Sequence, residues 1–207
     1  MATATAPAPR SVLADAFAVR AHAGAASRAW ARNAVLILAG ALFTALCAQI
    51  SIPVPPSPVP VTGQTLAVVL VGATLGAWRG GSALALYLLL GLAFPVYADG
   101  ASGWSVVTGA SGGYLVGFIV AAAVIGRLAE RGADRKVLTA FACFVAGQLI
   151  VFAFGVTGLK LAVGQDWGWT IHNGFTVFIV GGLIKAAIAG AALPSAWRLV
   201  RRFDGSR

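Results

Sequence analysis

Long runs of apolar residues constrain the fold of this chain more than any other feature of its sequence. A helix needs about 20 mostly apolar residues to cross the hydrocarbon core of a bilayer, and six segments approach that length. They are Ala34–Ile50, Gly63–Trp78, Ser82–Val96, Gly112–Leu128, Val137–Thr157 and Gly174–Ala196. Charged residues make up only 10% of the chain, against about 25% in soluble domains. We therefore predict an all-α integral membrane protein with six transmembrane helices.

The basic residues orient these six predicted helices. With six crossings, every Lys and Arg other than Lys160 and Lys185 falls on one side of the membrane. Cytoplasmic loops carry the excess of Lys and Arg, so both termini are predicted to be cytoplasmic. The net charge of +9 then reflects membrane topology. No stripe of basic and aromatic residues points to a nucleic-acid partner.

Two short parts flank the predicted six-helix domain, which covers residues 34–197. Residues 1–33 are rich in Ala and Arg and predict a poorly ordered cytoplasmic extension in which Ser11–Trp30 can form helix. Residues 198–207 form a basic cytoplasmic tail. Cys47 and Cys143 both lie inside apolar segments and belong to no paired motif, so the sequence predicts packing roles for them, with neither a disulfide nor a metal site.

Lys185 is the one charged residue inside the predicted spans that no topological role explains. It lies in the middle of the sixth span, Gly174–Ala196, about 16 Å of helix rise from either end. An ionisable side chain at that depth costs roughly 2.5 kcal/mol or more and normally faces a cavity, a partner or a ligand. Lys185 is therefore the first candidate for a functional residue.

The predicted outer side carries most of the remaining polar and aromatic residues. Five prolines between positions 53 and 60 exclude helix there and indicate a stiff, apolar, Pro-rich outer loop across the mouth of the bundle. Gln64 follows at the start of the second span. Later outer loops bring further polar and aromatic groups, namely Tyr97, Asp99, Trp104, Trp167, Trp169 and Asn173. The tryptophans are equally typical of an interfacial aromatic belt, but together with Lys185 these groups predict a small-molecule pocket.

A stripe of small residues runs along the first span. Ala34, Ala41, Ala45 and Ala48 recur at spacings that place them on one helix face. Such a face packs either against the protein's own bundle or against another membrane subunit, and the sequence leaves both interpretations open.

Four stretches of the chain resemble the signatures of one family. They are VPVTGQTL at residues 59–66, YLLLGLAFPVY at 87–97, GASGGYL at 109–115 and GGLIKA at 181–186. In order and spacing they are similar to motifs of the biotin-specific substrate-binding (S) components of energy-coupling factor (ECF) transporters, the BioY family. The resemblance covers about residues 34–197.

The resemblance implies a biotin-binding membrane protein of the prokaryotic cytoplasmic (inner) membrane that is not an enzyme and holds no cofactor. Its partners would be a transmembrane coupling (T) subunit and two ATPase subunits, with the alanine stripe as the docking face; a homo-oligomer stays open. The chain has no Gly-x-x-x-x-Gly-Lys-Ser/Thr phosphate loop of its own. The implied biotin-binding residues are Lys185, Gln64, Tyr97, Asp99, Ser111, Gly112, Gly113, Tyr114 and Asn173.

One departure from the family pattern concerns Lys185. The family's acidic residue three positions before the lysine is Gly182 here, so Lys185 lacks the partner that would share its helix face. Three features could each compensate for the missing acidic partner: Asp99 or Asp166 folds inward, the lysine is neutral in the empty site, or the ligand supplies the acceptor. We expect the ureido ring of biotin to enter first and accept from Lys185; the reverse pose pairs Lys185 with the biotin carboxylate.

Three alternative functions stay open at this point. The first is an S component for another vitamin. The second is a rhomboid-like intramembrane serine protease, because Gly109-Ala110-Ser111-Gly112 matches a Gly-x-Ser-Gly nucleophile motif and His172 is a candidate base. The third is a carrier that works without partners, although the chain lacks an acidic relay for proton coupling.

Overall fold

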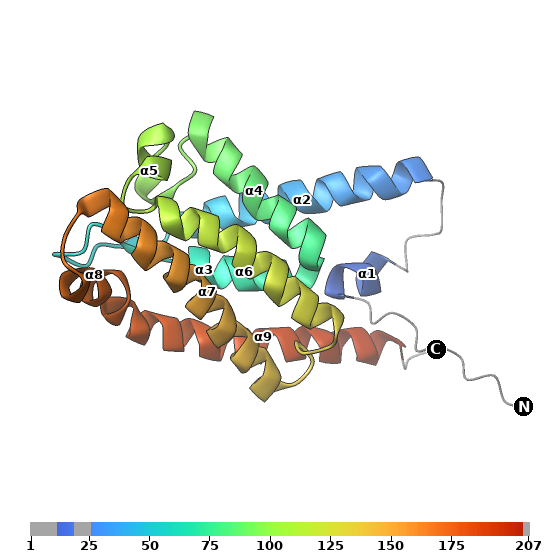
Figure 1. The fold of residues 1–207 in the computed structure, drawn as a ribbon. Coiled ribbons are helices and arrows are strands. Elements are labelled where there is room, and N and C mark those ends of the chain that lie inside the picture. The colour runs from blue at the N-terminus through green and yellow to red at the C-terminus, as the bar shows by residue number, and fades with distance from the viewer. Residues whose placement is uncertain (1–11, 19–25, 205–207) are drawn as a thin grey trace, which may run out of the picture.

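The computed structural model describes residues 12–18 and 26–204 and is almost entirely helical within them (Figure 1). Two short strands and two 3-10 turns accompany the α-helices. The helices are α1 Leu13–Ala18, α2 Ala26–Ala48, α3 Gln64–Leu75, α4 Ala77–Ala93, α5 Trp104–Thr108, α6 Gly112–Glu130, α7 Val137–Val163, α8 Trp167–Gly174 and α9 Ile179–Asp204; the strands are β1 Ser51–Ile52 and β2 Val61–Thr62; the 3-10 turns are η1 Ala98–Gly100 and η2 Thr176–Phe178.

Five helical stretches in the described part of the chain are long and apolar enough to cross a bilayer. They are Ala29–Ala48, Ala77–Gly100, Gly112–Glu130, Val137–Val163 and Trp167–Val200. The helix in the predicted second span, α3, has 12 residues and a length of about 18 Å. Helix α3 begins at Gln64, one residue after the predicted start, and Gly76, with φ +88°, ends it before α4 begins at Ala77. The structure therefore shows a multi-pass helical membrane protein whose second predicted span is shorter than expected.

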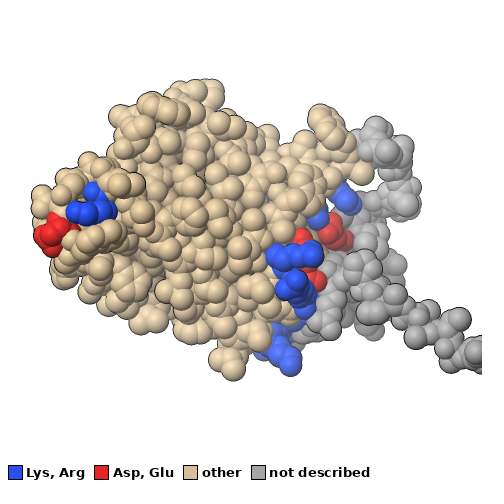
Figure 2. All heavy atoms as spheres, in the orientation of Figure 1, with Lys and Arg blue, Asp and Glu red and all other residues tan. Residues whose placement is uncertain are grey.

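Charged side chains lie at the two ends of the bundle and leave the middle of the visible face free of charge (Figure 2). Helix α1 and the C-terminal end of α9 lie at the same end of the molecule (Figure 1). Some of the basic residues used to orient the sequence, Arg10, Arg20 and Arg207, lie outside the described residues. A charge-free band between two polar ends is the surface that a bilayer requires.

The described residues of the two flanking parts are largely helical. Within residues 1–33, α1 covers Leu13–Ala18 and α2 already begins at Ala26. Val12 and Leu13 are buried, the latter in a cluster with Val69, Ala189 and Leu193. At the other end, α9 continues through Asp204, so the basic tail from residue 198 extends a membrane helix.

Small residues bring the helices of the bundle close together. Helix α6 packs against α3, α4 and α7. At the crossing of α6 and α7, a Cβ built on Gly113 would lie only 2.3 Å from the carbonyl oxygen of Phe154. Glycine is therefore required at this crossing for packing.

The alanine stripe of α2 mostly faces the interior. Ala41, Ala45 and Ala48 are buried in the same cluster as Val71 of α3 and Leu84 of α4. Ala34 alone is exposed. In this structure three of the four small side chains pack α2 against its own bundle, and Ala34 is the position of the stripe that faces outward.

Candidate functional site

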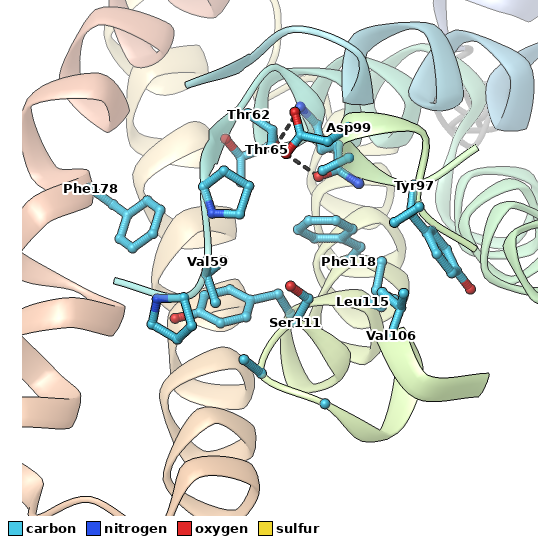
Figure 3. Close-up of a pocket in the computed structure, with 18 of the residues that line it drawn as sticks. Val59, Thr62, Thr65, Tyr97, Asp99, Val106, Ser111, Leu115, Phe118 and Phe178 are labelled. Carbon is cyan, nitrogen blue, oxygen red and sulfur yellow. Dashed lines mark hydrogen bonds between the residues drawn. The ribbon is translucent and has the colours of Figure 1, made fainter. Parts of the chain in front are cut away.

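A cavity of about 350 Å³ lies among α3, α6, α7, α9 and the loops at one end of the bundle. Its volume is at the lower end of the range for small-molecule sites, ~300–1,000 Å³. Figure 3 shows Phe178 and Tyr97 on opposite sides of it, with Val59 and Ser111 between them. The walls are largely apolar and aromatic, with a few polar groups, as in most ligand sites. The lining residues used below are Pro58, Val59, Pro60, Gln64, Thr65, Tyr97, Asp99, Ser105, Ser111, Tyr114, Phe118, Gln148, Phe152, Phe178 and Lys185.

The Pro-rich segment forms part of the cavity wall. Strand β1 pairs antiparallel with β2, with Ser51 opposite Thr62, and the prolines lie in the loop between them. The Ser57 hydroxyl lies 2.8 Å from the carbonyl oxygen of Asn173 at the end of α8. This contact fixes the loop beside α8, and Pro58 to Pro60 then reach the cavity.

Lys185 lies nearer to one end of its helix than the sequence predicted. Because α9 begins at Ile179, Lys185 is only about 9 Å of helix rise from the helix start. Its Nζ donates to the carbonyl oxygen of Thr62 and to the Thr65 hydroxyl, the latter at 2.9 Å. The ammonium group is thus held against the start of α3, on the cavity wall, and Lys185 lies near the middle of the apolar helical stretch Trp167–Val200.

No carboxylate takes the place of the missing acidic partner. Asp99 is exposed and accepts from the Ser51 hydroxyl at 3.1 Å. Asp166 is exposed and caps α8 by accepting from the Trp169 backbone N–H at 3.0 Å. In the part of the chain that the structure describes, no ion pair involves Lys185. Asp99 reaches the cavity lining without pairing with Lys185 and Asp166 caps α8, so neither aspartate supplies the expected partner in this structure.

Gln64 lines the cavity, but its amide is already used within the protein. Its oxygen accepts from the Thr62 hydroxyl at 2.8 Å, and its nitrogen donates to the Tyr87 hydroxyl at 2.6 Å. The Tyr87 hydroxyl in turn donates to the carbonyl oxygen of Val96 at 3.1 Å. Gln64 therefore fixes the backbone around Thr62, whose carbonyl holds Lys185.

Two tyrosines of the predicted site act as walls. The Tyr97 hydroxyl donates to the carbonyl oxygen of Leu88 at 2.6 Å, and the Tyr114 hydroxyl donates to that of Gly174 at 2.7 Å. Both rings are buried, and both hydroxyls are used in these contacts within the protein. A ligand would meet the ring faces and edges of the two tyrosines.

Six of the nine predicted ligand residues line this cavity, and three do not. Gly113 packs in the crossing with α7, and a Cβ on Gly112 would collide with the carbonyl oxygen of Val107 at 1.8 Å. The Asn173 amide nitrogen donates to the carbonyl oxygen of Trp169 at 2.9 Å within α8. These three residues support the site from behind its lining. The six that line it are Lys185, Gln64, Tyr97, Asp99, Ser111 and Tyr114.

Comparison with known proteins identifies the family. A family model described as the BioY family matches residues 18–202 of the chain. The chain belongs to the BioY family. It is 38% identical over 157 residues to the biotin transporter BioY2 of Lactococcus lactis, which covers 74% of this chain and 83% of that protein. It is 43% identical over 158 residues to the biotin transporter BioY of Thermotoga maritima, covering 74% and 90% respectively.

A solved structure shares the fold of this BioY-family chain. It is the S-component for biotin from an ECF-type ABC transporter, with a TM-score of 0.76 over 85% of this chain and 95% of that one. The sequence identity in this match is 20%, so it establishes the fold alone.

Several lining residues of this BioY-family cavity were missed by the sequence analysis. Phe118, Phe152 and Phe178 carry no signal that separates them from ordinary core residues. Gln148 does carry one, because it is a lone amide inside the apolar run Val137–Thr157. A polar side chain within a membrane span is a functional candidate by the same reasoning that singled out Lys185.

The geometry does not support a serine protease site. Ser111 lines the cavity, whereas His172 is exposed on α8 and is not part of the lining. Within residues 12–18 and 26–204, no hydrogen bond joins the two side chains. A nucleophile and its base must lie within hydrogen-bond reach to act together.

Proposed function

We propose that this chain is the biotin-binding membrane subunit of an ECF-type uptake transporter. The observation that carries the proposal is the cavity of about 350 Å³, with aromatic walls and one lysine, in a chain of the BioY family. Its relatives in Lactococcus lactis and Thermotoga maritima are named biotin transporters. We assign the chain a role in binding and translocation and no catalytic activity.

The proposed topology has six crossings, made by α2, α3, α4, α6, α7 and α9, with both termini in the cytoplasm of a prokaryotic cell. The position of α1 and the end of α9 at the same end of the bundle supports it (Figure 1). The Pro-rich segment and the cavity then face the outside. The short α3 completes its crossing together with the extended residues that precede it.

The proposed ligand pose places the ureido ring of biotin beside Lys185. The ammonium group donates to the ureido oxygen in place of one of its present acceptors, the carbonyl of Thr62 or the hydroxyl of Thr65. The carboxylate lies toward Ser105 of α5 and Ser111, which directly precedes the start of α6. Backbone N–H groups at the start of a helix favour a negative charge. The carboxylate end of biotin is therefore placed near the start of α6, and the ureido end beside Lys185.

The proposed partners are a T component and two ATPase subunits, which supply the energy that this chain does not. Because Ala41, Ala45 and Ala48 are buried, contact with the T component would use the exposed side of α2, where Leu38, Leu42 and Leu46 lie. Co-purification of the tagged chain with a co-expressed T component tests this assignment. Loss of the complex on replacing Leu42 and Leu46 by Asn, with biotin binding kept, is the expected result.

Equilibrium binding of labelled biotin to the purified chain in detergent, without partner subunits, tests the central proposal. Lys185→Ala should weaken binding about tenfold or more, because a hydrogen bond from a charged group contributes ~1.5–3 kcal/mol. Lys160→Ala is the matched control, since Lys160 lies at the end of α7 and is not part of the cavity lining.

Three outcomes separate the hypotheses. Weaker binding by the Lys185 variant alone supports the site as described. Equal binding by both variants would remove Lys185 from it. No binding of biotin by the folded wild-type chain would instead favour another vitamin as the ligand.

A further inference from the structure

Gln148 is a buried amide on α7 with an unused hydrogen-bonding atom. The residue is 8% exposed and lines the cavity. Among the residues that the structure describes, no hydrogen-bond partner reaches its Oε1 atom, which is itself fully buried. Buried polar groups in folded proteins are nearly always paired, so an unpaired one on a cavity wall points to a missing partner.

The second glutamine of the cavity provides the contrast. The amide oxygen of Gln64 accepts from Thr62, and its nitrogen donates to Tyr87. Gln64 is therefore held in a network whatever occupies the cavity. Gln148 is held by no such network among the described residues, so its amide can turn toward a ligand in the cavity that the residue lines.

The absence of a side chain at Gly182 leaves room for the Gln148 side chain. A Cβ at position 182 would lie 3.1 Å from the Gln148 Nε2 atom, which is tighter than ordinary packing. Gly182 precedes Lys185 by three residues on α9, so the two positions share one helix face. The amide of Gln148 thus occupies the space beside the turn of α9 that carries the lysine.

We propose that Gln148 is a ligand-binding residue whose amide oxygen accepts a hydrogen bond from a ureido N–H of biotin. The inference rests on the proposed function and deepens it. A ureido group presents one carbonyl acceptor flanked by two N–H donors. The cavity offers the complementary set on neighbouring surfaces, an ammonium donor from Lys185 and an amide acceptor from Gln148.

This arrangement determines ligand selectivity. A site with a paired donor and acceptor discriminates strongly against a ligand that lacks one of the matching groups, because a buried polar atom is then left unpaired. Gln148 would therefore select for a free ureido N–H, while Lys185 selects for the ureido oxygen. The aromatic walls contribute affinity without this selectivity.

The test measures binding of biotin and of its two mono-N-methyl ureido isomers to wild-type protein and to Gln148→Met in detergent. Methionine keeps the length and bulk of the side chain and removes the amide. We expect Gln148→Met to weaken biotin binding about tenfold and to leave binding of one of the two methylated isomers unchanged. Gln165→Met, at an exposed position, is the control and should match wild type with every ligand.

Gly182→Ala supplies a second variant if Gln148→Met fails to fold. The added Cβ should displace the Gln148 amide and weaken biotin binding. In a Gln148→Met background the same change should not alter the preference for biotin over the methylated isomers any further, because the amide that reads the ureido N–H is already gone.

Each other outcome overturns the inference in a recognisable way. Unchanged biotin binding by Gln148→Met, with Lys185→Ala still weak, excludes Gln148 and leaves the proposed function intact. An equal loss for biotin and both methylated isomers assigns Gln148 a packing role. Failure of wild type to bind biotin refutes the proposed function itself.

Discussion

Gly91 leaves room for the Tyr97 ring, which forms one side of the cavity. Replacing Gly91 by Ala is the sharpest test of this packing. A Cβ at Gly91 would lie 2.1 Å from two ring carbons of Tyr97. Two contacts hold the Tyr97 ring in place. Its hydroxyl donates to the Leu88 carbonyl at 2.6 Å, and it packs edge-on against Tyr87 at a centroid distance of 5.6 Å. Tyr97 must therefore move, and the free space available to it is the cavity.

The magnitude follows from three contributions to the free energy of unfolding. Overpacking a filled site costs ~1–3 kcal/mol, and loss of the Tyr97 hydrogen bond costs about 1 kcal/mol. Replacing Gly by Ala within a helix returns about 1 kcal/mol. Gly91→Ala should therefore lower stability by about 1–3 kcal/mol, or by ~2–4 °C in Tm for each kcal/mol in a chain of this size.

Thermal unfolding of the purified protein in detergent measures this effect, and Gly81→Ala provides the control in the same helix. The nearest atom to a Cβ at Gly81 is 3.5 Å away, an ordinary contact, so this variant should be stabilised. Gly91→Ala should also weaken biotin binding, and Tyr97→Val in the Gly91→Ala background should restore Tm in part. If Gly91→Ala and Gly81→Ala shift Tm equally, Tyr97 is not seated as described.

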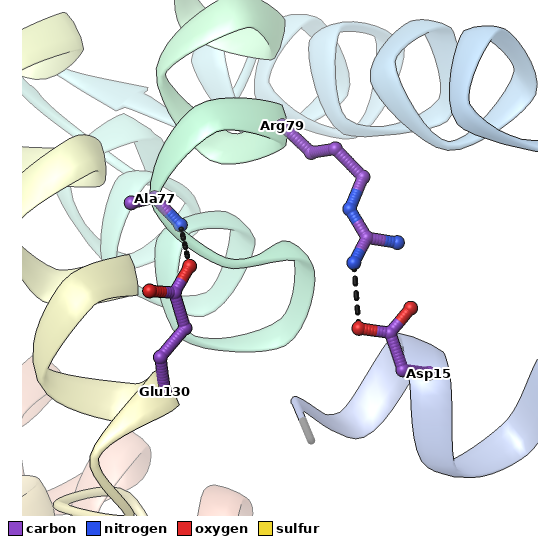
Figure 4. Close-up of polar contacts among 4 residues, drawn as sticks. All are labelled: Asp15, Ala77, Arg79 and Glu130. Atoms are coloured by element: carbon purple, nitrogen blue, oxygen red, sulfur yellow. Dashed lines mark hydrogen bonds and ion pairs between the residues drawn. The ribbon is translucent and has the colours of Figure 1, made fainter. Parts of the chain in front are cut away.

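Three further predictions concern other parts of the chain. Asp15 and Arg79 pair at 2.7 Å with side-chain exposures of 32% and 8% (Figure 4). Asp15→Ala leaves the buried guanidinium without its carboxylate, so it should lower the free energy of unfolding by ~1–3 kcal/mol more than Arg79→Met does, measured as the larger drop in Tm. Equal losses would argue against this pair as an anchor of α1. Burial raises the pKa of Asp134, whose carboxylate accepts from the Trp197 indole. The folded state thus keeps the Asp134 proton to higher pH than the unfolded chain does. The stability that the folded state gains from holding this proton is lost as pH rises through the raised pKa. Asp134→Asn should therefore gain Tm relative to wild type between pH 4 and pH 7, and a constant difference would contradict this assignment. Ser111→Ala should weaken biotin binding by less than about tenfold, whereas loss of a measured proteolytic activity would revive the protease hypothesis.

The sequence predicted the helical membrane class because hydrophobic length is a local property. The fourth span was expected at Gly112–Leu128 and is observed as α6, Gly112–Glu130. The breaks were harder to predict, since Gly76 ends α3 through a backbone angle that apolar composition does not reveal. The sixth predicted span, Gly174–Ala196, lies within the observed apolar stretch Trp167–Val200, but its division into α8, η2 and a helix that begins at Ile179 was not predicted.

The sequence by itself determined that this chain must lie in a membrane, which residues are unusual within it, and which family its motifs resemble. Lys185 and the departure from the family pattern at Gly182 could both be identified from the sequence alone. Only the tertiary structure decided what they contact: Lys185 meets Thr65, 120 positions away along the chain, and Gly182 makes room for the amide of Gln148. Helix packing brings these residues together. Such contacts depend on where and at what angle two helices cross, and the order of the helices in the sequence does not specify the resulting distances between side chains.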